Sequence, residues 1–168
     1  MSKVLTNIFK LKHLAYALFA LAGVVALLTI FQITTAAIGQ PRMMVVVGDS
    51  MLPALKPYDV VFLEPVDKDN VKVGEIVAAD YRARNALFSN YDYLVHRVIK
   101  VWESDGKAFM QTKGDNNRLP EMAAPAEKAV GRVSGSVPFL GLLISPPGNF
   151  IIIGAALLVF VRMRQKRM

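Results

Sequence analysis

The stretch YLVHRVIKVWESDGKAFMQT, residues 93–112, decides the fold class of this chain. Its two halves, residues 93–102 and 108–112, are rich in Val, Ile and aromatic side chains, which favour β-strands. Asp105 and Gly106 stand between the halves, and both tolerate the positive φ that a tight turn requires. The stretch therefore predicts a β-hairpin.

Further short runs of the same composition lie on either side of the hairpin, separated by turn residues. None of them has the spacing of an amphipathic helix. We therefore predict a mainly β fold, a compact β-rich domain of about 100 residues, with residues 82–92 as a surface loop. The runs are residues 43–47, 60–63, 75–81 and 130–134.

Two long uncharged runs flank this domain. Residues 14–31 include about eighteen residues without a charge, enough to cross the hydrocarbon core of a bilayer as a helix. The second run, residues 133–161, is interrupted by Pro146-Pro147-Gly148, so its helix is expected to start near Asn149. The predicted organisation is a basic cytoplasmic N-terminus (1–13), a transmembrane helix (14–37), an extracytoplasmic β-rich domain (38–145), a second transmembrane helix (146–162) and a basic cytoplasmic tail (163–168).

Each run leaves one alternative open. The stretch at residues 35–39 offers small residues after the first run, as in a cleavable signal peptide, although the run is long for one. The second run is short for a full crossing. Either Arg162 and Arg164 extend to the interface, or part of residues 139–144 also enters the membrane.

The charges lie where a membrane topology puts them. The chain has 20 Lys and Arg against 13 Asp and Glu, a net charge of +7, yet every acidic residue falls between Asp49 and Glu127. The basic excess lies in the two tails, which favours cytoplasmic termini and a middle domain on the export side. A nucleic-acid partner would require a basic folded face, so this pattern disfavours it. The absence of cysteine excludes disulfides and thiolate metal sites.

Two polar residues interrupt the apolar strands in places suited to chemistry. In VVVGDSMLP, residues 45–53, Ser50 follows an apolar strand and a glycine, so its hydroxyl can project into a cleft. His96 lies within a predicted strand, where alternation places it on the same face as Leu94 and Val98. Taken singly, the serine is more often a turn or cap residue and the histidine a packed side chain.

A third cluster, TKGDNN at residues 112–117, ends a predicted strand and taken alone is a turn. Peptide hydrolysis needs a nucleophile, a base that titrates near pH 7 and a group that orients the base. Ser50, His96 and Asp115 supply this set in order. Lys113 is the competing base, but the neighbouring carboxylate favours its charged form.

These motifs resemble the archaeal and endoplasmic-reticulum type of the signal peptidase I family, in which serine and histidine act together. A lysine replaces the histidine in the bacterial branch, so His96 assigns this chain to the histidine branch. The resemblance is carried by GDSMLP (48–53), HRV (96–98), TKGDNN (112–117), VGRV (130–133) and PFLG (138–141).

The resemblance implies a membrane-bound serine endopeptidase that cleaves N-terminal signal peptides from exported preproteins after small residues. Ser50 would be the nucleophile and His96 the general base, with Asp115 orienting the base and no metal or cofactor. The implied partners are signal peptides, the lipid bilayer and the export machinery. The implied location is the cell membrane of a prokaryote or the endoplasmic-reticulum membrane.

The chain departs from the family pattern at two positions. Tyr58 precedes Asp59 where the family has glycine, so that turn must form without one. The family's second acidic residue is represented by Glu121, one methylene longer than aspartate, and Glu121 is therefore the reserve for orienting His96.

Two other functions remain open from the sequence. A related membrane serine protease with a different substrate would share the same motifs. A non-enzymatic, membrane-anchored β-domain that binds a partner would leave Ser50 and His96 without a common site.

Overall fold

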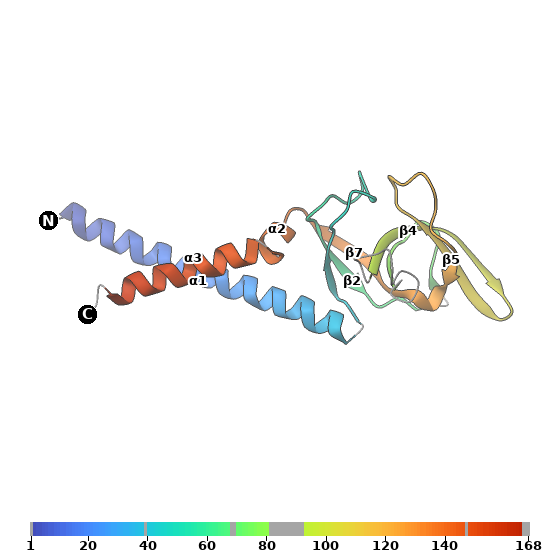
Figure 1. Ribbon diagram of the computed structural model, residues 1–168, viewed down its shortest axis with the longest axis horizontal. Helices are drawn as coiled ribbons and strands as arrows, with labels where there is room; N and C mark the ends of the chain where they lie inside the picture. The colour runs from blue at the N-terminus through green and yellow to red at the C-terminus, as the bar shows by residue number, and fades with distance from the viewer. Residues whose placement is uncertain (1, 39, 68–69, 81–92, 147, 166–168) are drawn as a thin grey trace. The chain divides into compact units, whose positions relative to one another are not determined.

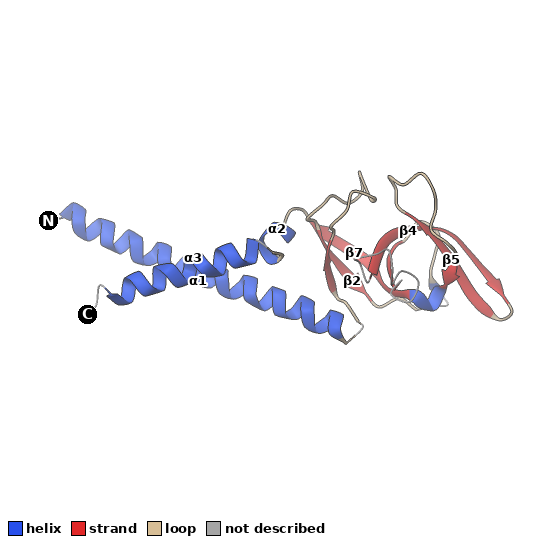
Figure 2. Cartoon of the chain, in the orientation of Figure 1, coloured by secondary structure: helices blue, strands red, loops and turns tan. Residues whose placement is uncertain are grey.

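The computed structural model describes residues 2–38, 40–67, 70–80, 93–146 and 148–165. The chain divides into two compact units, one made of Met1–Phe31 with Leu142–Met168 and the other of Gln32–Gly141. Figure 2 shows that the first unit is helical and that the second consists mainly of strands. The surface loop expected at residues 82–92 lies outside the described residues.

The helical unit contains most of α1 (Ser2–Ala37) and all of α3 (Gly148–Gln165). The two helices run in opposite directions (Figure 1). The rings of Phe19 and Phe160 form a T-shaped pair with centroids 6.2 Å apart. The start of α1 and the end of α3 therefore lie at the same end of this unit. A short helical turn, α2 (Gly141–Ile144), precedes the break before α3.

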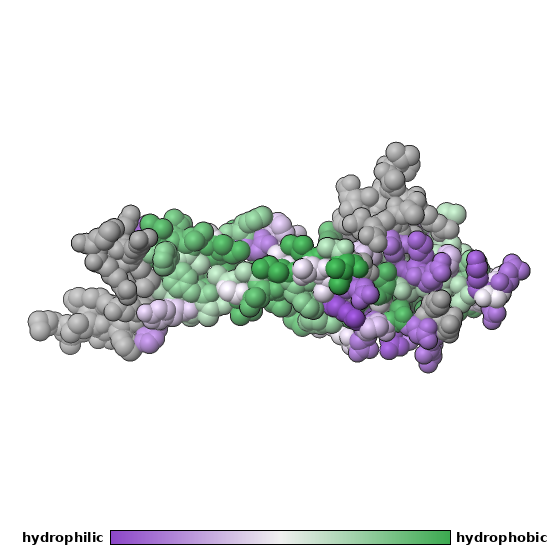
Figure 3. Space-filling view, turned by 90° about the horizontal axis from the view of Figure 1, so that it is seen from below, coloured by the Kyte–Doolittle hydropathy of each residue, from purple (hydrophilic) through white to green (hydrophobic). Residues whose placement is uncertain are grey.

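One helix among the described residues is long and apolar enough to cross a bilayer. Its apolar stretch is Ala15–Thr35 in α1, with a mean hydropathy of 2.2. The apolar part of α3, Gly148–Arg162, is shorter, so the span at 146–162 stays a prediction. Figure 3 shows mainly apolar side chains on the coloured part of the helical unit, whereas most of the hydrophilic side chains in this view lie on the strand unit.

The strand unit is a curled antiparallel sheet of seven strands, in the order β1-β2-β7-β3-β4-β5-β6. The predicted mainly β fold is confirmed, and each predicted run forms a strand whose ends lie within three residues of the predicted ends. Sequence reasoning missed the two-residue β6 and the 3-10 turn η2 (Ala126–Lys128). The strands are β1 (Met43–Val45), β2 (Val60–Glu64), β3 (Ile76–Asp80), β4 (Tyr93–Ser104), β5 (Lys107–Lys113), β6 (Ala124–Pro125) and β7 (Ala129–Val137).

The hairpin between β4 and β5 is confirmed at the expected turn. Asp105 and Gly106 both have positive φ, 52° and 69°, which matches the twist of a two-residue hairpin loop. Trp102 lies opposite Phe109 across the hairpin, and their rings stack at 5.8 Å. This aromatic pair adds to the backbone ladder in fixing the register.

Apolar side chains on the two faces of the sheet form two core clusters. Alternation along β4 is confirmed, because Leu94 and Val98 pack into one cluster and Val95 packs into the other. The second cluster also contains Met51, which directly follows the predicted nucleophile. The core of the strand unit therefore holds both β4, which carries His96, and the turn that carries Ser50.

The turn at Tyr58 forms without glycine because the tyrosine itself adopts the left-handed conformation, with φ 68°. The buried carboxylate of Asp59 accepts hydrogen bonds from the backbone N–H of Lys56, at 2.9 Å, and of Phe139, at 3.3 Å. The N–H of Gly141 donates to the carbonyl of Tyr58 at 2.9 Å. These contacts join the end of the β7 segment to the start of β2.

Candidate active site

Ser50 lies in a tight turn that follows the edge strand β1. Val46 pairs with the chain that leads into β2, through Val46 N–H to Asp59 O at 2.8 Å and Tyr58 N–H to Val46 O at 2.7 Å. The chain then turns, and Leu52 N–H donates to Asp49 O at 3.1 Å. Because the next side chain, Met51, is fully buried, the turn is anchored on the core while Ser50 stays partly exposed.

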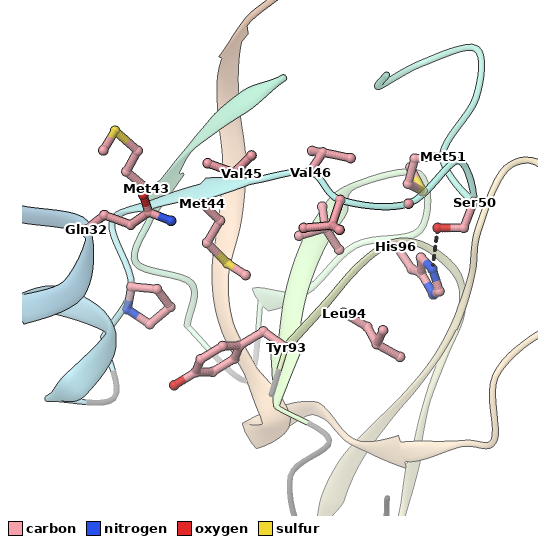
Figure 4. Close-up of a pocket in the computed structure, with 14 residues that line it drawn as sticks. Gln32, Met43, Met44, Val45, Val46, Ser50, Met51, Tyr93, Leu94 and His96 are labelled. Carbon is pink, nitrogen blue, oxygen red and sulfur yellow. Dashed lines mark hydrogen bonds between the residues drawn. The ribbon is translucent and has the colours of Figure 1, made fainter. Parts of the chain in front are cut away.

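His96 lies in β4 opposite Val77 of β3 and is 4% exposed. Its Nε2 lies 3.1 Å from Oγ of Ser50, the contact drawn as a dashed line in Figure 4. The fold thus brings together the two residues that sequence reasoning named as nucleophile and base, although they are 46 positions apart in the chain. At this distance the imidazole can accept the hydroxyl proton directly.

The other ring nitrogen of His96 faces Glu121. Oε1 of Glu121 lies 3.4 Å from Nδ1, but within the described part of the chain Nδ1 has no hydrogen bond of good geometry. The backbone of Glu121 is tied to β5, since its N–H donates to Thr112 O at 2.8 Å and its carbonyl accepts from Gln111 Nε2 at 3.0 Å. The side chain alone therefore sets the distance from Glu121 to the histidine.

The environment of His96 favours the neutral imidazole. Burial lowers the pKa of His96 below its usual value, and the negative charges of Glu121 and then Asp115 oppose this shift. A histidine that is neutral near pH 7 can act as a general base.

Asp115, which was expected to orient His96, forms an ion pair with Arg97. Its Oδ1 accepts from Nε of Arg97 at 2.8 Å and its Oδ2 accepts from the terminal nitrogen Nη2 at 2.7 Å. Hydrogen bonds from Arg97 lower the pKa of Asp115, and the same carboxylate raises the pKa of Arg97. The structure brings Asp115 to Arg97 rather than to Nδ1 of His96.

The segment around Asp115 approaches the backbone of Ser50. The N–H of Asn116 donates to the carbonyl of Ser50 at 2.8 Å, and its side-chain Nδ2 donates to Asp49 O at 3.3 Å. A Cβ on Gly114 would lie 2.7 Å from that same carbonyl, so only glycine permits this approach. Sequence reasoning assigned no role to Asn116 or Arg97. The feature of the sequence that pointed to them was their position inside the motifs at 112–117 and 96–98.

An open cavity of about 360 Å³ runs up to the Ser50–His96 pair. One wall comes from β1 and the residues after it, and the other from the start of β4 (Figure 4). Its walls are mainly apolar, with Met44, Val46 and Leu94 among the side chains. In the part of the chain that the structure describes, no group of three or more His, Asp or Glu side chains is arranged to hold a metal ion.

No protein-family model matches the chain. The signal peptidase complex catalytic subunit SEC11C of Homo sapiens is 35% identical over 108 residues, which cover 59% of this chain and 53% of that protein. SEC11 of Scheffersomyces stipitis, named as the same kind of subunit, is 34% identical over 106 residues, covering 58% of this chain and 60% of that protein. The chain thus spans about half the length of the mammalian relative it matches. These similarities confirm the resemblance to the endoplasmic-reticulum type of signal peptidase I that the motifs indicate.

Proposed function

We propose that this chain is a membrane-anchored serine endopeptidase that removes signal peptides from exported preproteins. The observation that carries the proposal is the 3.1 Å contact between Nε2 of His96 and Oγ of Ser50 at the end of an open apolar cavity. A non-enzymatic binding domain would have no need for this contact between a buried base and a hydroxyl. The curated relatives are catalytic subunits, which agrees with this reading.

In this mechanism His96 removes the proton of Ser50 as the serine oxygen attacks the scissile carbonyl. His96 then donates this proton to the leaving amine as the peptide C–N bond breaks, which leaves an acyl-enzyme and a neutral imidazole. A water that gives its proton to the same histidine hydrolyses the acyl-enzyme, and the histidine returns that proton to Ser50. Proton acceptance at Nε2 requires the tautomer with hydrogen on Nδ1, and the acid nearest to that nitrogen is Glu121. We therefore assign the orienting role to Glu121 rather than to Asp115. The backbone N–H of Ser50 is the proposed donor to the tetrahedral oxygen.

The substrate would bind as an extra strand. β1 is an edge strand of the sheet, and its residues line the cavity whose other wall is the start of β4. An extended peptide laid along β1 would present alternate side chains to the apolar walls and its scissile carbonyl to Ser50. Shallow pockets along such a groove would accept small side chains, as signal-peptide cleavage requires.

Membrane anchoring supports the choice of substrate. The apolar stretch Ala15–Thr35 comes before the first strand, β1, in the chain. An anchor of this kind would keep the catalytic domain near the bilayer that holds the apolar segment of a signal peptide. The names of the relatives refer to a signal peptidase complex. We propose that the chain acts on the export side of a membrane, next to the export machinery.

The test is cleavage of a preprotein by the purified full chain in detergent, compared with Ser50→Ala. Ser136→Ala, at an exposed serine on β7, is the matched control. We expect Ser50→Ala to abolish both cleavage and labelling by a fluorophosphonate while its thermal unfolding stays unchanged, and Ser136→Ala to behave like the parent. Turnover by a folded Ser50→Ala variant would refute the proposal. Labelling of Ser50 without cleavage of any preprotein would point to a serine protease with another substrate.

A further inference from the structure

We propose that Arg97 and Asp115 are positioning residues whose ion pair holds the backbone of Ser50 in reach of His96, through the turn at residues 114–117. This inference rests on the proposed function and extends it to a pair that contacts neither the hydroxyl nor the imidazole. Its basis is a chain of contacts from β4 to the nucleophile.

The first link is the guanidinium of Arg97. It binds both carboxylate oxygens of Asp115, at 2.8 and 2.7 Å, and its remaining terminal nitrogen donates to Gly74 O at 2.9 Å. Two parallel N–H···O bonds fix the orientation of a carboxylate as well as its distance. Asp115 is therefore held in one place relative to β4.

The second link is the turn that carries Asp115. Asn117 N–H donates to Gly114 O at 2.9 Å, which closes the turn. Asn116 then uses its backbone N–H to hold Ser50 O, at 2.8 Å, and its side-chain amide to hold Asp49 O, at 3.3 Å. Asn116, the residue next to Asp115, thus binds the backbone carbonyls of both Asp49 and Ser50.

The base and the ion pair start from neighbouring positions on one strand, β4. His96 and Arg97 point to opposite faces of β4, which is paired on both sides, His96 with Val77 and Arg97 with Lys113. The strand therefore holds the base directly and the nucleophile through Arg97. Loss of the ion pair would leave His96 in place and release the turn that positions Ser50.

The expected defect is local. The side chains of Arg97 and Asp115 are 34% and 20% exposed, and ion pairs with this access to water add little to stability. Misplacement of a reacting atom by about 1 Å, in contrast, can reduce the rate by on the order of 100-fold.

The test measures kcat and KM for preprotein cleavage, together with the rate of fluorophosphonate labelling, in the full chain. The variants are Asp115→Asn, Arg97→Gln, the double variant of these two, and Arg97→Lys. Lysine keeps the positive charge but cannot form the two parallel hydrogen bonds of the guanidinium. Glu75→Gln is the matched control, because Arg132 of β7 holds Glu75, the residue before β3, in a similar ion pair at 2.9 Å, outside the serine turn.

We expect Asp115→Asn and Arg97→Gln each to lower kcat and the labelling rate roughly 10- to 100-fold with KM nearly unchanged. The double variant should be no worse than either single variant, since one link is lost in all three. Arg97→Lys should fall between parent and Arg97→Gln. Glu75→Gln should keep parental kcat.

Three results would overturn the inference. In the first, the fold-loss of kcat in the double variant equals the product of the two single fold-losses. In the second, Glu75→Gln loses as much activity as Asp115→Asn. In the third, Asp115→Asn shifts the pH midpoint of kcat/KM more than Glu121→Gln does. A parent chain that neither cleaves preproteins nor reacts with the fluorophosphonate would instead refute the proposed function itself, so the two failures are distinct.

Discussion

Nδ1 of His96 faces Oε1 of Glu121 at 3.4 Å, on the opposite edge of the ring from Ser50. A carboxylate in this place favours the tautomer with hydrogen on Nδ1 and stabilises the imidazolium that forms when the serine is deprotonated. The contact is longer than a good hydrogen bond, and Nδ1 is buried. Small movements of the Glu121 side chain therefore govern how well the base is oriented.

Glu121→Gln should lower kcat/KM by on the order of 10²- to 10⁴-fold, because the charge that stabilises the imidazolium is lost. Asp115→Asn should cause the smaller loss, since Arg97 rather than His96 binds Asp115. Glu121→Asp should also be impaired, because a shorter side chain lies farther from Nδ1. Preprotein cleavage measures all three, with Glu127→Gln at an exposed position as the control. A near-parental Glu121→Gln beside an inactive Asp115→Asn, both folded, would restore Asp115 as the orienting acid.

The pH dependence of kcat/KM should show one ionisation, that of His96. Activity requires the neutral imidazole, so it is lost as pH falls through the pKa of His96, which burial lowers below its usual 6.5. Glu121→Gln should move the midpoint lower still, because the negative charge of Glu121 raises this pKa. Lys113→Ala should leave the profile unchanged. A limb near pH 9 that disappears in Lys113→Ala would instead identify lysine as the base.

Gly114→Ala should impair both folding and cleavage. The added Cβ would lie 2.7 Å from Ser50 O and 2.9 Å from Cγ of Asn117, so the serine turn would have to shift. Crowding of this kind costs about 1–3 kcal/mol. Gly135→Ala is the control, since its Cβ would meet nothing within 4 Å. Chemical denaturation and kcat measure the effect, and parental values for Gly114→Ala would mean that the close approach is unimportant.

Tyr58→Gly should be more stable than Tyr58→Ala by about 1 kcal/mol, because the position has φ 68° and only glycine adopts this conformation without strain. Both variants lose the same half-exposed ring, so the difference between their stabilities reports the backbone strain at this position. Thermal unfolding of the two variants in detergent measures it. Equal stabilities would mean that the chain around Asp59 relaxes when the ring is removed.

Single-cysteine variants test the membrane topology, and the natural absence of cysteine makes the background clean. With both termini in the cytoplasm, Lys12→Cys and Arg164→Cys should be protected from an impermeant thiol reagent in intact prokaryotic cells, where Lys107→Cys should react. In sealed microsomes with the cytoplasmic face outward the pattern should be reversed. Equal labelling of Lys107→Cys and Arg164→Cys would contradict the second span at 146–162.

Several features of this protein follow from local sequence. Two residues at 105–106 determine the hairpin because positive φ is a property of Asp and Gly themselves. The two-residue period of a strand places Leu94 and Val98 on one face and Val95 on the other. The order of the motifs also names Ser50 and His96 as partners, which the 3.1 Å contact agrees with.

Tertiary structure alone decided the rest. The sequence places Asp115 and Glu121 in the same segment after β5, and both are carboxylates, so pattern cannot say which one faces His96. That choice depends on long-range contacts: Arg97 binds Asp115 from the next strand, and backbone hydrogen bonds to β5 direct Glu121 toward Nδ1. The insertion of β7 between β2 and β3 is equally non-local. Such pairings are determined by packing between distant segments, which no local propensity encodes.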